Sequence, residues 1–256
     1  MGANIRRERD RCDHVLTAQG LTPSRDVAVR MILAGKVKSN GTIVDKPSRV
    51  IPLDAVIEII GESRPFVSRG GEKLEAALGA CSIDPQGLIC LDVGCSTGGF
   101  TDCLLQKGAA KVYAVDVGYG QFDWRLRQDP RVVLIERTNI RYMSPSAVPD
   151  PVDLVVIDVS FISLTKVLPP IMKFLRCPAH VIALIKPQFE VGKGQVGRGG
   201  IVRDDAQRTE AAHRVVRFAA DIGLRTVRTV ASPIKGKKGN QEILAILAYN
   251  TPFHGM

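Results

Sequence analysis

The chain has 256 residues, of which 45% are hydrophobic and 24% charged, the composition of an ordinary soluble globular protein. This length allows one domain of medium size and a second, small one. The net charge is +9, from 35 Lys and Arg against 26 Asp and Glu. Such a charge favours a polyanionic partner, most simply nucleic acid, although a basic surface that only keeps the protein soluble would carry the same charge.

The cysteines and the apolar segments exclude several protein classes. None of the cysteines forms a C-x-x-C pair, which argues against a zinc site or a disulfide framework; they are Cys12, Cys81, Cys90, Cys95, Cys103 and Cys177. The charged segment 1–11 lacks the apolar stretch of a signal peptide, and no apolar run approaches the roughly 18 residues that a transmembrane helix requires. We therefore expect a protein of the reducing cytoplasm that binds no metal ion.

Residues 1–62 predict a small α+β domain with a loose basic tail at its start. Its expected elements are a helix over residues 11–20, a helix between Ser24 and Gly35, a hairpin over residues 36–44 and a strand over residues 50–60. Ser24 supplies an N-cap for the second helix, and Asn40-Gly41 supplies the turn of the hairpin.

Positively charged side chains are distributed along this small domain. The candidates for RNA contact are Arg11, Arg25, Arg30, Lys36 and Lys38. Arg25 and Arg30 lie near the start of the second helix, where backbone amides also attract phosphate. The arrangement favours a module that binds the RNA backbone. The alternative is an ordinary solvated helix face.

Residues 63–71 predict a polar linker, and residues 72–256 change to an alternating pattern of strands and helices. The expected strands are 87–91, 111–116, 131–135, 152–158, 180–186, 225–230 and 243–249. Helices are expected between them, notably over residues 206–223. Seven strands that alternate with helices predict an α/β fold with a doubly wound, Rossmann-like sheet.

The most informative motif is Asp92-Val-Gly-Cys-Ser-Thr-Gly-Gly-Phe100, which follows the first of these strands. Gly94 and Gly98 would let the backbone approach a ligand where a Cβ would clash. The spacing G-x-x-x-G-G differs from the G-x-G-x-x-G of dinucleotide-binding proteins. An acid at the strand end together with this looser turn suits the methionine and ribose of S-adenosylmethionine, and it favours a methyltransferase. The alternative is a tight turn that binds no ligand.

Polar residues at the ends of the next two strands complete the predicted cofactor site. Asp116 ends the second strand, at the position where an acid commonly binds ribose hydroxyls. Asn139 follows the third strand and could meet the adenine edge. The alternative role for Asp116 is a simple cap of its strand.

Asp158 and Lys186 follow two further strands and suggest a mechanism. Methyl transfer from a sulfonium needs a nucleophile in line with the methyl group. A ribose 2′-hydroxyl is almost wholly protonated at neutral pH, and a lysine whose pKa is lowered by its surroundings can accept that proton. The segment Asp158-Val-Ser-Phe161 also lacks the Pro-Pro pair that is usual in enzymes that methylate exocyclic base amines. The alternative for Lys186 is an exposed cation at a strand end.

Two later loops, residues 188–203 and 232–242, are rich in glycine and lysine. They could fold over an RNA backbone or close the site, and a plain hairpin loop is the alternative for each. The cations expected to contact RNA in this domain are Arg69, Lys193, Arg198, Lys235, Lys237 and Lys238.

Taken together, several segments between about Arg11 and Tyr249 resemble the TlyA family, a group of bacterial ribosomal-RNA 2′-O-methyltransferases that are sometimes labelled hemolysins. The segments that carry the resemblance are Ser24-Arg25, Val67-Ser-Arg-Gly-Gly, Lys73-Leu-Glu-Ala-Ala-Leu78, the motif from Asp92 to Asp102, Ala114-Val-Asp-Val-Gly-Tyr-Gly120, Glu136-Arg-Thr-Asn-Ile-Arg141, Asp158-Val-Ser-Phe-Ile-Ser-Leu164, Leu184-Ile-Lys-Pro-Gln-Phe-Glu190 and Lys238-Gly-Asn-Gln-Glu242. No single segment is specific, whereas the set is.

The resemblance implies an N-terminal RNA-binding domain of the S4 type and a C-terminal domain similar to FtsJ-type methyltransferases. It also implies a Lys-Asp-Lys-Glu tetrad at Lys73, Asp158, Lys186 and Glu242, with Lys186 as the base and the other three adjusting its basicity and the position of the sugar. Of these four, the residues by themselves indicate only Asp158 and Lys186. The implied contacts to S-adenosylmethionine are Asp92, Gly94, Ser96, Thr97, Gly98, Asp116 and Asn139.

The function expected from these observations is methyl transfer from S-adenosylmethionine to a ribose 2′-hydroxyl, that of a cytidine, in ribosomal RNA. One alternative is an RNA-binding or ribosome-assembly factor without turnover, which would not need two lysines and two acids at these places. A second alternative is a membrane-active hemolysin, which the absence of a spanning or amphipathic anchor segment disfavours.

Overall fold

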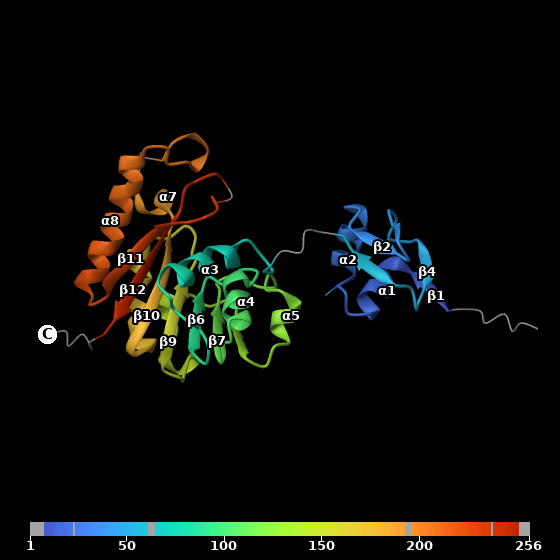
Figure 1. Ribbon diagram of the computed structural model, residues 1–256, viewed down its shortest axis with the longest axis horizontal. Helices are drawn as coiled ribbons and strands as arrows, with labels where there is room; N and C mark the ends of the chain where they lie inside the picture. The colour runs from blue at the N-terminus through green and yellow to red at the C-terminus, as the bar shows by residue number, and fades with distance from the viewer. Residues whose placement is uncertain (1–7, 23, 61–64, 193–195, 237, 251–256) are drawn as a thin grey trace, which may run out of the picture. The chain divides into compact units, whose positions relative to one another are not determined.

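The computed structural model describes residues 8–22, 24–60, 65–192, 196–236 and 238–250 (Figure 1). The chain divides into two compact units, Met1–Ser63 and Arg64–Met256. The basic tail expected over residues 1–8 lies almost entirely outside the described residues. Helix α3 begins at Gly70, inside the segment expected to be a linker.

The N-terminal unit places two helices among short strands. Its elements are β1 (Arg9–Arg11), α1 (Cys12–Ala18), α2 (Arg25–Leu33), β2 (Val37–Ser39), β3 (Thr42–Ile43), β4 (Val50–Pro52) and β5 (Ile57–Ile59). Strands β3, β2 and β5 form one antiparallel sheet, and β1 pairs with β4 in another. Leu16 of α1, Ile32 of α2 and Val37 of β2 are fully buried in a common core, whose burial provides the main force that holds this unit together.

The local signals of this unit produce the elements expected from them. Helix α2 begins after Ser24, whose Oγ accepts a hydrogen bond from the backbone N–H of Val27. Asn40 and Gly41 have φ values of 49° and 78°, the left-handed pair that a two-residue hairpin requires. The second helix and the hairpin are therefore confirmed.

The single strand expected over residues 50–60 is wrong. The chain forms two strands there, of which β4 pairs with β1 and β5 pairs with β2. A turn separates them, closed by a hydrogen bond from the backbone N–H of Ala55 to the carbonyl of Pro52. Leu53 still donates its N–H to the carbonyl of Glu8, and the turn then directs the chain to a different partner strand, so one continuous strand cannot form.

The C-terminal unit contains one seven-stranded sheet. Its strands are β6 (Ile89–Val93), β7 (Lys111–Val115), β8 (Val132–Ile135), β9 (Val152–Ile157), β10 (Leu175–Ile185), β11 (Arg225–Ala231) and β12 (Ile243–Tyr249). Their order is β11-β12-β10-β9-β6-β7-β8. Strands β6 to β10 are parallel, and β12 runs antiparallel to both β10 and β11. The predicted Rossmann-like sheet is confirmed.

Helices cover both faces of this sheet (Figure 1). They are α3 (Gly70–Ala80), α4 (Gly99–Gln106), α5 (Trp124–Arg127), α6 (Leu168–Ile171), α7 (Pro187–Glu190) and α8 (Asp205–Asp221), with short 3-10 turns η1 (Ile140–Tyr142), η2 (Pro145–Ala147), η3 (Leu164–Lys166), η4 (Met172–Phe174) and η5 (Arg198–Gly200). Successive strand residues point to opposite faces. Cys90 accordingly packs in a cluster with Leu74 of α3, whereas Leu91 packs in a cluster with Val215 of α8. None of the helices in the described part of the chain is long and apolar enough to cross a membrane.

Candidate functional site

Three neighbouring strands bring polar residues to one edge of the sheet. Asp158 follows β9, Lys186 follows the parallel strand β10, and Glu242 precedes the antiparallel strand β12. The ends of parallel strands and the start of an antiparallel neighbour meet at the same edge. Lys73 reaches this edge from α3, which contacts β12.

The four residues form two close Lys–carboxylate pairs. Nζ of Lys186 lies 2.6 Å from Oδ1 of Asp158, and Nζ of Lys73 donates a hydrogen bond of 2.5 Å to Oε2 of Glu242. The side chains of Lys73 and Glu242 are only 11% and 4% exposed. Nearly buried charges of this kind require a partner. The structure thus brings together all four residues of the predicted tetrad.

Both pairs line one cavity of about 670 Å³. The wall of the cavity also includes Gly94, Ser96 and Thr97 from the glycine turn after β6. Asp92, Gly98, Asp116 and Asn139, the remaining predicted cofactor contacts, are not part of the lining. A methyl donor bound at the turn would therefore share a cavity with the tetrad.

The carboxylate of Asp116 organises the glycine turn. Its Oδ2 accepts a hydrogen bond of 2.8 Å from the backbone N–H of Ser96, and its Oδ1 accepts one of 2.6 Å from that of Gly118. The backbone N–H groups of Gly94 and Cys95 both point to the carbonyl of Val115. The end of β7 thus holds the turn that follows β6.

The two glycines of the turn permit close contacts between segments of the protein. Gly94 and Gly98 have φ values of +85° and +93°, which residues with a Cβ atom rarely adopt. A Cβ on Gly94 would lie 2.5 Å from the backbone oxygen of Asp158, and one on Gly98 would lie 2.5 Å from Cδ1 of Leu126. These contacts place the turn against the segment that carries Asp158. The expectation that the two glycines also make room for a ligand stays a prediction.

Asp92 lies at the end of β6 and is completely buried. Its Oδ2 accepts a hydrogen bond of 2.7 Å from Oγ1 of Thr101. Its buried Oδ1 has no hydrogen-bond partner among the described residues. Burial raises the pKa of this carboxyl to about 7.

Asn139 has a local role, because its Oδ1 accepts hydrogen bonds from the backbone N–H and from Nε of Arg141.

Sequence reasoning missed two residues, one that contacts the tetrad and one that holds the segment after Asp158. Ser160 accepts a hydrogen bond of 2.9 Å from Nζ of Lys186. Glu190 is buried, and its carboxylate accepts hydrogen bonds from Oγ of Ser163 at 2.6 Å and from the backbone N–H of Leu164 at 2.8 Å. Burial raises the pKa of Glu190. Its place in the segment Leu184-Ile-Lys-Pro-Gln-Phe-Glu190 was the signal that could have identified it.

An aromatic pair borders the same cavity. Phe161 is 90% exposed and has a φ of 64°, and its ring centroid lies 5.1 Å from that of Phe189. A bulky residue in the left-handed region is unusual and marks a segment held by its surroundings. The exposed ring offers an apolar surface beside Lys186.

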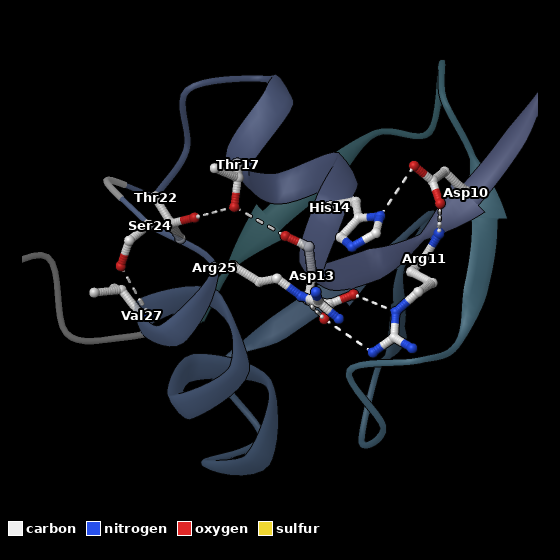
Figure 2. Close-up of polar contacts among 9 residues, drawn as sticks. All are labelled: Asp10, Arg11, Asp13, His14, Thr17, Thr22, Ser24, Arg25 and Val27. Carbon is white, nitrogen blue, oxygen red and sulfur yellow. Dashed lines mark hydrogen bonds and ion pairs between the residues drawn. The ribbon is translucent and has the colours of Figure 1, made fainter.

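The predicted RNA contacts fall into three groups. Arg69, Lys235 and Lys238 are exposed and line the cavity. In the N-terminal unit, Arg30 and Lys36 are exposed, Lys38 lies 4.0 Å from Glu58, and Arg11 and Arg25 both bind Asp13 (Figure 2). Lys193, Lys237 and the side chain of Arg198 lie outside the described residues. No cluster of His, Cys, Asp or Glu suited to a metal ion occurs in the described ranges.

Comparison with known proteins matches one family to each of the two units. Residues 66–249 match the family of FtsJ-like methyltransferases, and residues 11–57 match the S4 domain. The 16S/23S rRNA (cytidine-2′-O)-methyltransferase TlyA of Mycobacterium tuberculosis is 47% identical over 244 residues, which cover 95% of this chain and 91% of that protein. Hemolysin A of Brachyspira hyodysenteriae is 45% identical over 236 residues, which cover 92% and 98%.

Solved structures extend the comparison. A candidate hemolysin from Streptococcus thermophilus superposes with a TM-score of 0.72 at 43% identity, over 94% of this chain and 89% of that one. The N-methyltransferase NodS from Bradyrhizobium japonicum, solved with S-adenosyl-L-homocysteine, has a TM-score of 0.52 at 17% identity and covers 74% of this chain and 90% of that one, a likeness of fold alone. The chain belongs to the TlyA family, with an S4 domain followed by an FtsJ-like methyltransferase domain.

Proposed function

We propose that this protein transfers the methyl group of S-adenosylmethionine to a ribose 2′-hydroxyl, that of a cytidine, in ribosomal RNA. The observation that carries the proposal is the convergence of Lys73, Asp158, Lys186 and Glu242 on the cavity that also borders the glycine turn. The name and the 47% identity of the Mycobacterium tuberculosis relative support the same substrate class.

The residues around the turn fit S-adenosylmethionine. The buried Oδ1 of Asp92 lacks a hydrogen-bond partner among the described residues, and a buried oxygen of this kind is suited to a donor on a ligand. Ser96 and Thr97 line the cavity, and Asp116 holds the turn at the end of β7. The cofactor would supply a methyl group on a positively charged sulfur.

Lys186 is the residue placed to remove the proton of the ribose hydroxyl. In its neutral form, Nζ accepts the proton from the 2′-oxygen as that oxygen becomes the nucleophile. Asp158 at 2.6 Å and Ser160 at 2.9 Å hold Nζ in one position. After proton transfer, the carboxylate of Asp158 stabilises the ammonium group that has formed. Lys73 and Glu242 line the same cavity and would orient the sugar.

The surroundings of the tetrad suit an RNA substrate. Arg69, Lys235 and Lys238 place exposed positive charge at the cavity, where phosphates flanking the target ribose would lie. The exposed ring of Phe161 provides a surface on which an unstacked base could rest. Action on ribosomal RNA would place the protein in the cytoplasm.

The test is transfer of labelled methyl from S-adenosylmethionine to purified ribosomal subunits and to naked ribosomal RNA. We expect label at a site that resists alkaline cleavage, because a methylated 2′-oxygen cannot attack the neighbouring phosphate. Lys186→Ala should abolish the label while cofactor binding persists, and Lys166→Ala, which removes an exposed lysine on η3, should retain it. Cofactor binding without transfer to any RNA would contradict the proposal and favour an assembly factor.

A further inference from the structure

Asp13 of α1 is a fully buried carboxylate in the N-terminal unit, and its side chain is 0% exposed. Three N–H groups from two arginines surround it (Figure 2). Arg11 donates from Nε to Oδ1 at 2.9 Å and from Nη2 to Oδ2 at 3.0 Å. Arg25 donates from Nε to Oδ2 at 2.8 Å. These bonds, those of Arg11 first, hold the pKa of Asp13 well below its usual range, so the carboxylate is ionised at neutral pH.

The two arginines come from different elements and remain accessible. Arg11 ends β1 and Arg25 begins α2, and their side chains are 39% and 53% exposed. Nη1 of Arg11 and both Nη groups of Arg25 bind no acceptor in the described part of the chain. One buried negative charge therefore holds two positive charges, and both half-exposed guanidinium groups keep N–H donors that the described residues leave unbound.

This geometry differs from that of two free surface arginines. A long side chain loses rotational freedom when it binds a phosphate, and a guanidinium recognises phosphate oxygens only when its planar fork is correctly oriented. The bonds to Asp13 fix both groups before any ligand arrives. Oγ1 of Thr17 also donates to the backbone oxygen of Asp13 at 2.9 Å, which holds the carboxylate's own helix turn.

We propose that Asp13 is a positioning residue that holds Arg11 and Arg25 as a preformed pair for the phosphodiester backbone of RNA. The inference rests on the proposed function, because it assumes that the N-terminal unit binds the RNA substrate. Asp13 itself does not touch the RNA and acts through the two arginines. The competing explanation is that the Asp13 cluster serves only to hold the fold together.

These explanations differ in the direction in which one substitution should change the affinity for RNA. Asp13→Asn removes a negative charge, and removal of negative charge by itself strengthens binding to a polyanion. We expect the opposite, an increase of about tenfold in the Kd for ribosomal RNA. The slope of log K against the logarithm of the salt concentration should also become shallower, by the amount that corresponds to about one lost phosphate contact. The matched control is Asp45→Asn, which removes an exposed carboxylate in the same unit and should bind RNA as well as the wild type or more tightly.

A positioning residue should have no effect when the residues it positions are absent. We expect Asp13→Asn to leave Kd unchanged in a background that carries Arg11→Gln and Arg25→Gln. A residue with a general effect on the fold would weaken binding in that background as well. All measurements use the full chain, filter binding of labelled ribosomal RNA, and a temperature below the unfolding transition of each variant.

Arg25→Lys provides an independent test if Asp13→Asn does not fold. Lysine retains the positive charge at the exposed start of α2 but cannot form the planar fork. We expect Arg25→Lys to bind RNA as weakly as Arg25→Gln. Binding by Arg25→Lys at the wild-type level would overturn the inference, as would unchanged or tighter binding by folded Asp13→Asn.

The outcomes also separate this inference from the proposed function. If the wild-type protein neither binds nor methylates ribosomal RNA, the proposed function fails and the inference falls with it. If the wild type binds and methylates RNA while Asp13→Asn binds at least as tightly, only the role of Asp13 fails. Cofactor affinity, measured by calorimetry for each variant, verifies that the methyltransferase unit is intact.

Discussion

Lys73 and Glu242 are separated by 169 positions in the chain, and Nζ of Lys73 lies 2.5 Å from Oε2 of Glu242. Lys73 belongs to the helix that precedes the first strand of the sheet, whereas Glu242 precedes the last strand. Gly236 packs against the pair so closely that a Cβ there would lie 2.5 Å from Oε1 of Glu242. The pair therefore joins the two ends of the methyltransferase unit at the cavity.

This pair predicts strong energetic coupling. Either Lys73→Met or Glu242→Gln alone leaves a nearly buried group without its partner, and each should lower the free energy of unfolding by about 3 kcal/mol. The loss of unfolding free energy in the double variant should be smaller than the sum of the two single losses, and the difference should exceed about 1 kcal/mol. Urea unfolding of the four proteins measures the coupling. Additive losses would show that the contact does not stabilise the fold, and methyl transfer should be lost in all three variants.

Glu190 predicts a link between stability and catalysis. Its carboxylate binds Ser163 and Leu164 in the segment that follows Asp158. Glu190→Gln replaces the charged acceptor by a neutral amide, which can bond Leu164 through its oxygen only if Ser163 turns its hydroxyl to accept from the N–H₂. We expect a loss of about 2 kcal/mol in stability together with a lower kcat. Glu210→Gln removes an exposed acid on α8 and should change neither. A normal kcat in Glu190→Gln would contradict the role of this residue in holding the catalytic segment.

The close approach at Gly94 predicts a difference between two glycines with similar backbones. Gly94 and Gly87 have φ values of +85° and +74°, but only Gly94 has an atom within 4 Å of the position of a Cβ. Both Gly94→Ala and Gly87→Ala should lower the free energy of unfolding by about 1 kcal/mol, because alanine is strained in the left-handed conformation. Gly94→Ala should lose more, and it should also lower kcat because it displaces Asp158. Thermal unfolding and methyl-transfer rates measure both effects, and equal behaviour of the two variants would refute the argument.

Asp92 predicts a dependence of stability on pH. Burial raises its pKa from 3.8 to about 7, so between these pH values the folded protein retains a proton that the unfolded chain has lost. The proton on Asp92 contributes fully to the free energy of unfolding below about pH 4. This contribution is lost as the pH rises towards about 7, by up to about 1.4 kcal/mol per pH unit. Asp92→Asn should remove this dependence. The difference in unfolding free energy between wild type and variant, measured across this range, should fall with pH, and a constant difference would contradict the prediction.

Local patterns determined much of this protein. The strand, turn and helix around Gly94, the hairpin at Asn40-Gly41 and the positions of Asp158 and Lys186 at strand ends all follow from a few adjacent residues. Steric limits on the backbone and the periods of helix and strand act over such short distances, so they can be recognised in the sequence. Lys73 and Glu242 were assigned only by resemblance to a family, because nothing near either residue indicates its partner.

The tertiary structure alone decided which distant groups meet. The order of the strands brings Glu242 to Lys73, the fold of the small domain buries Asp13 between Arg11 and Arg25, and the pairing of β4 and β5 with different strands divides a segment expected to be continuous. Likewise, the close neighbours of Gly94 and Gly98 are protein atoms from other segments. These contacts depend on the packing of the whole chain, since a charged side chain can be buried only where another part of the molecule supplies its partner.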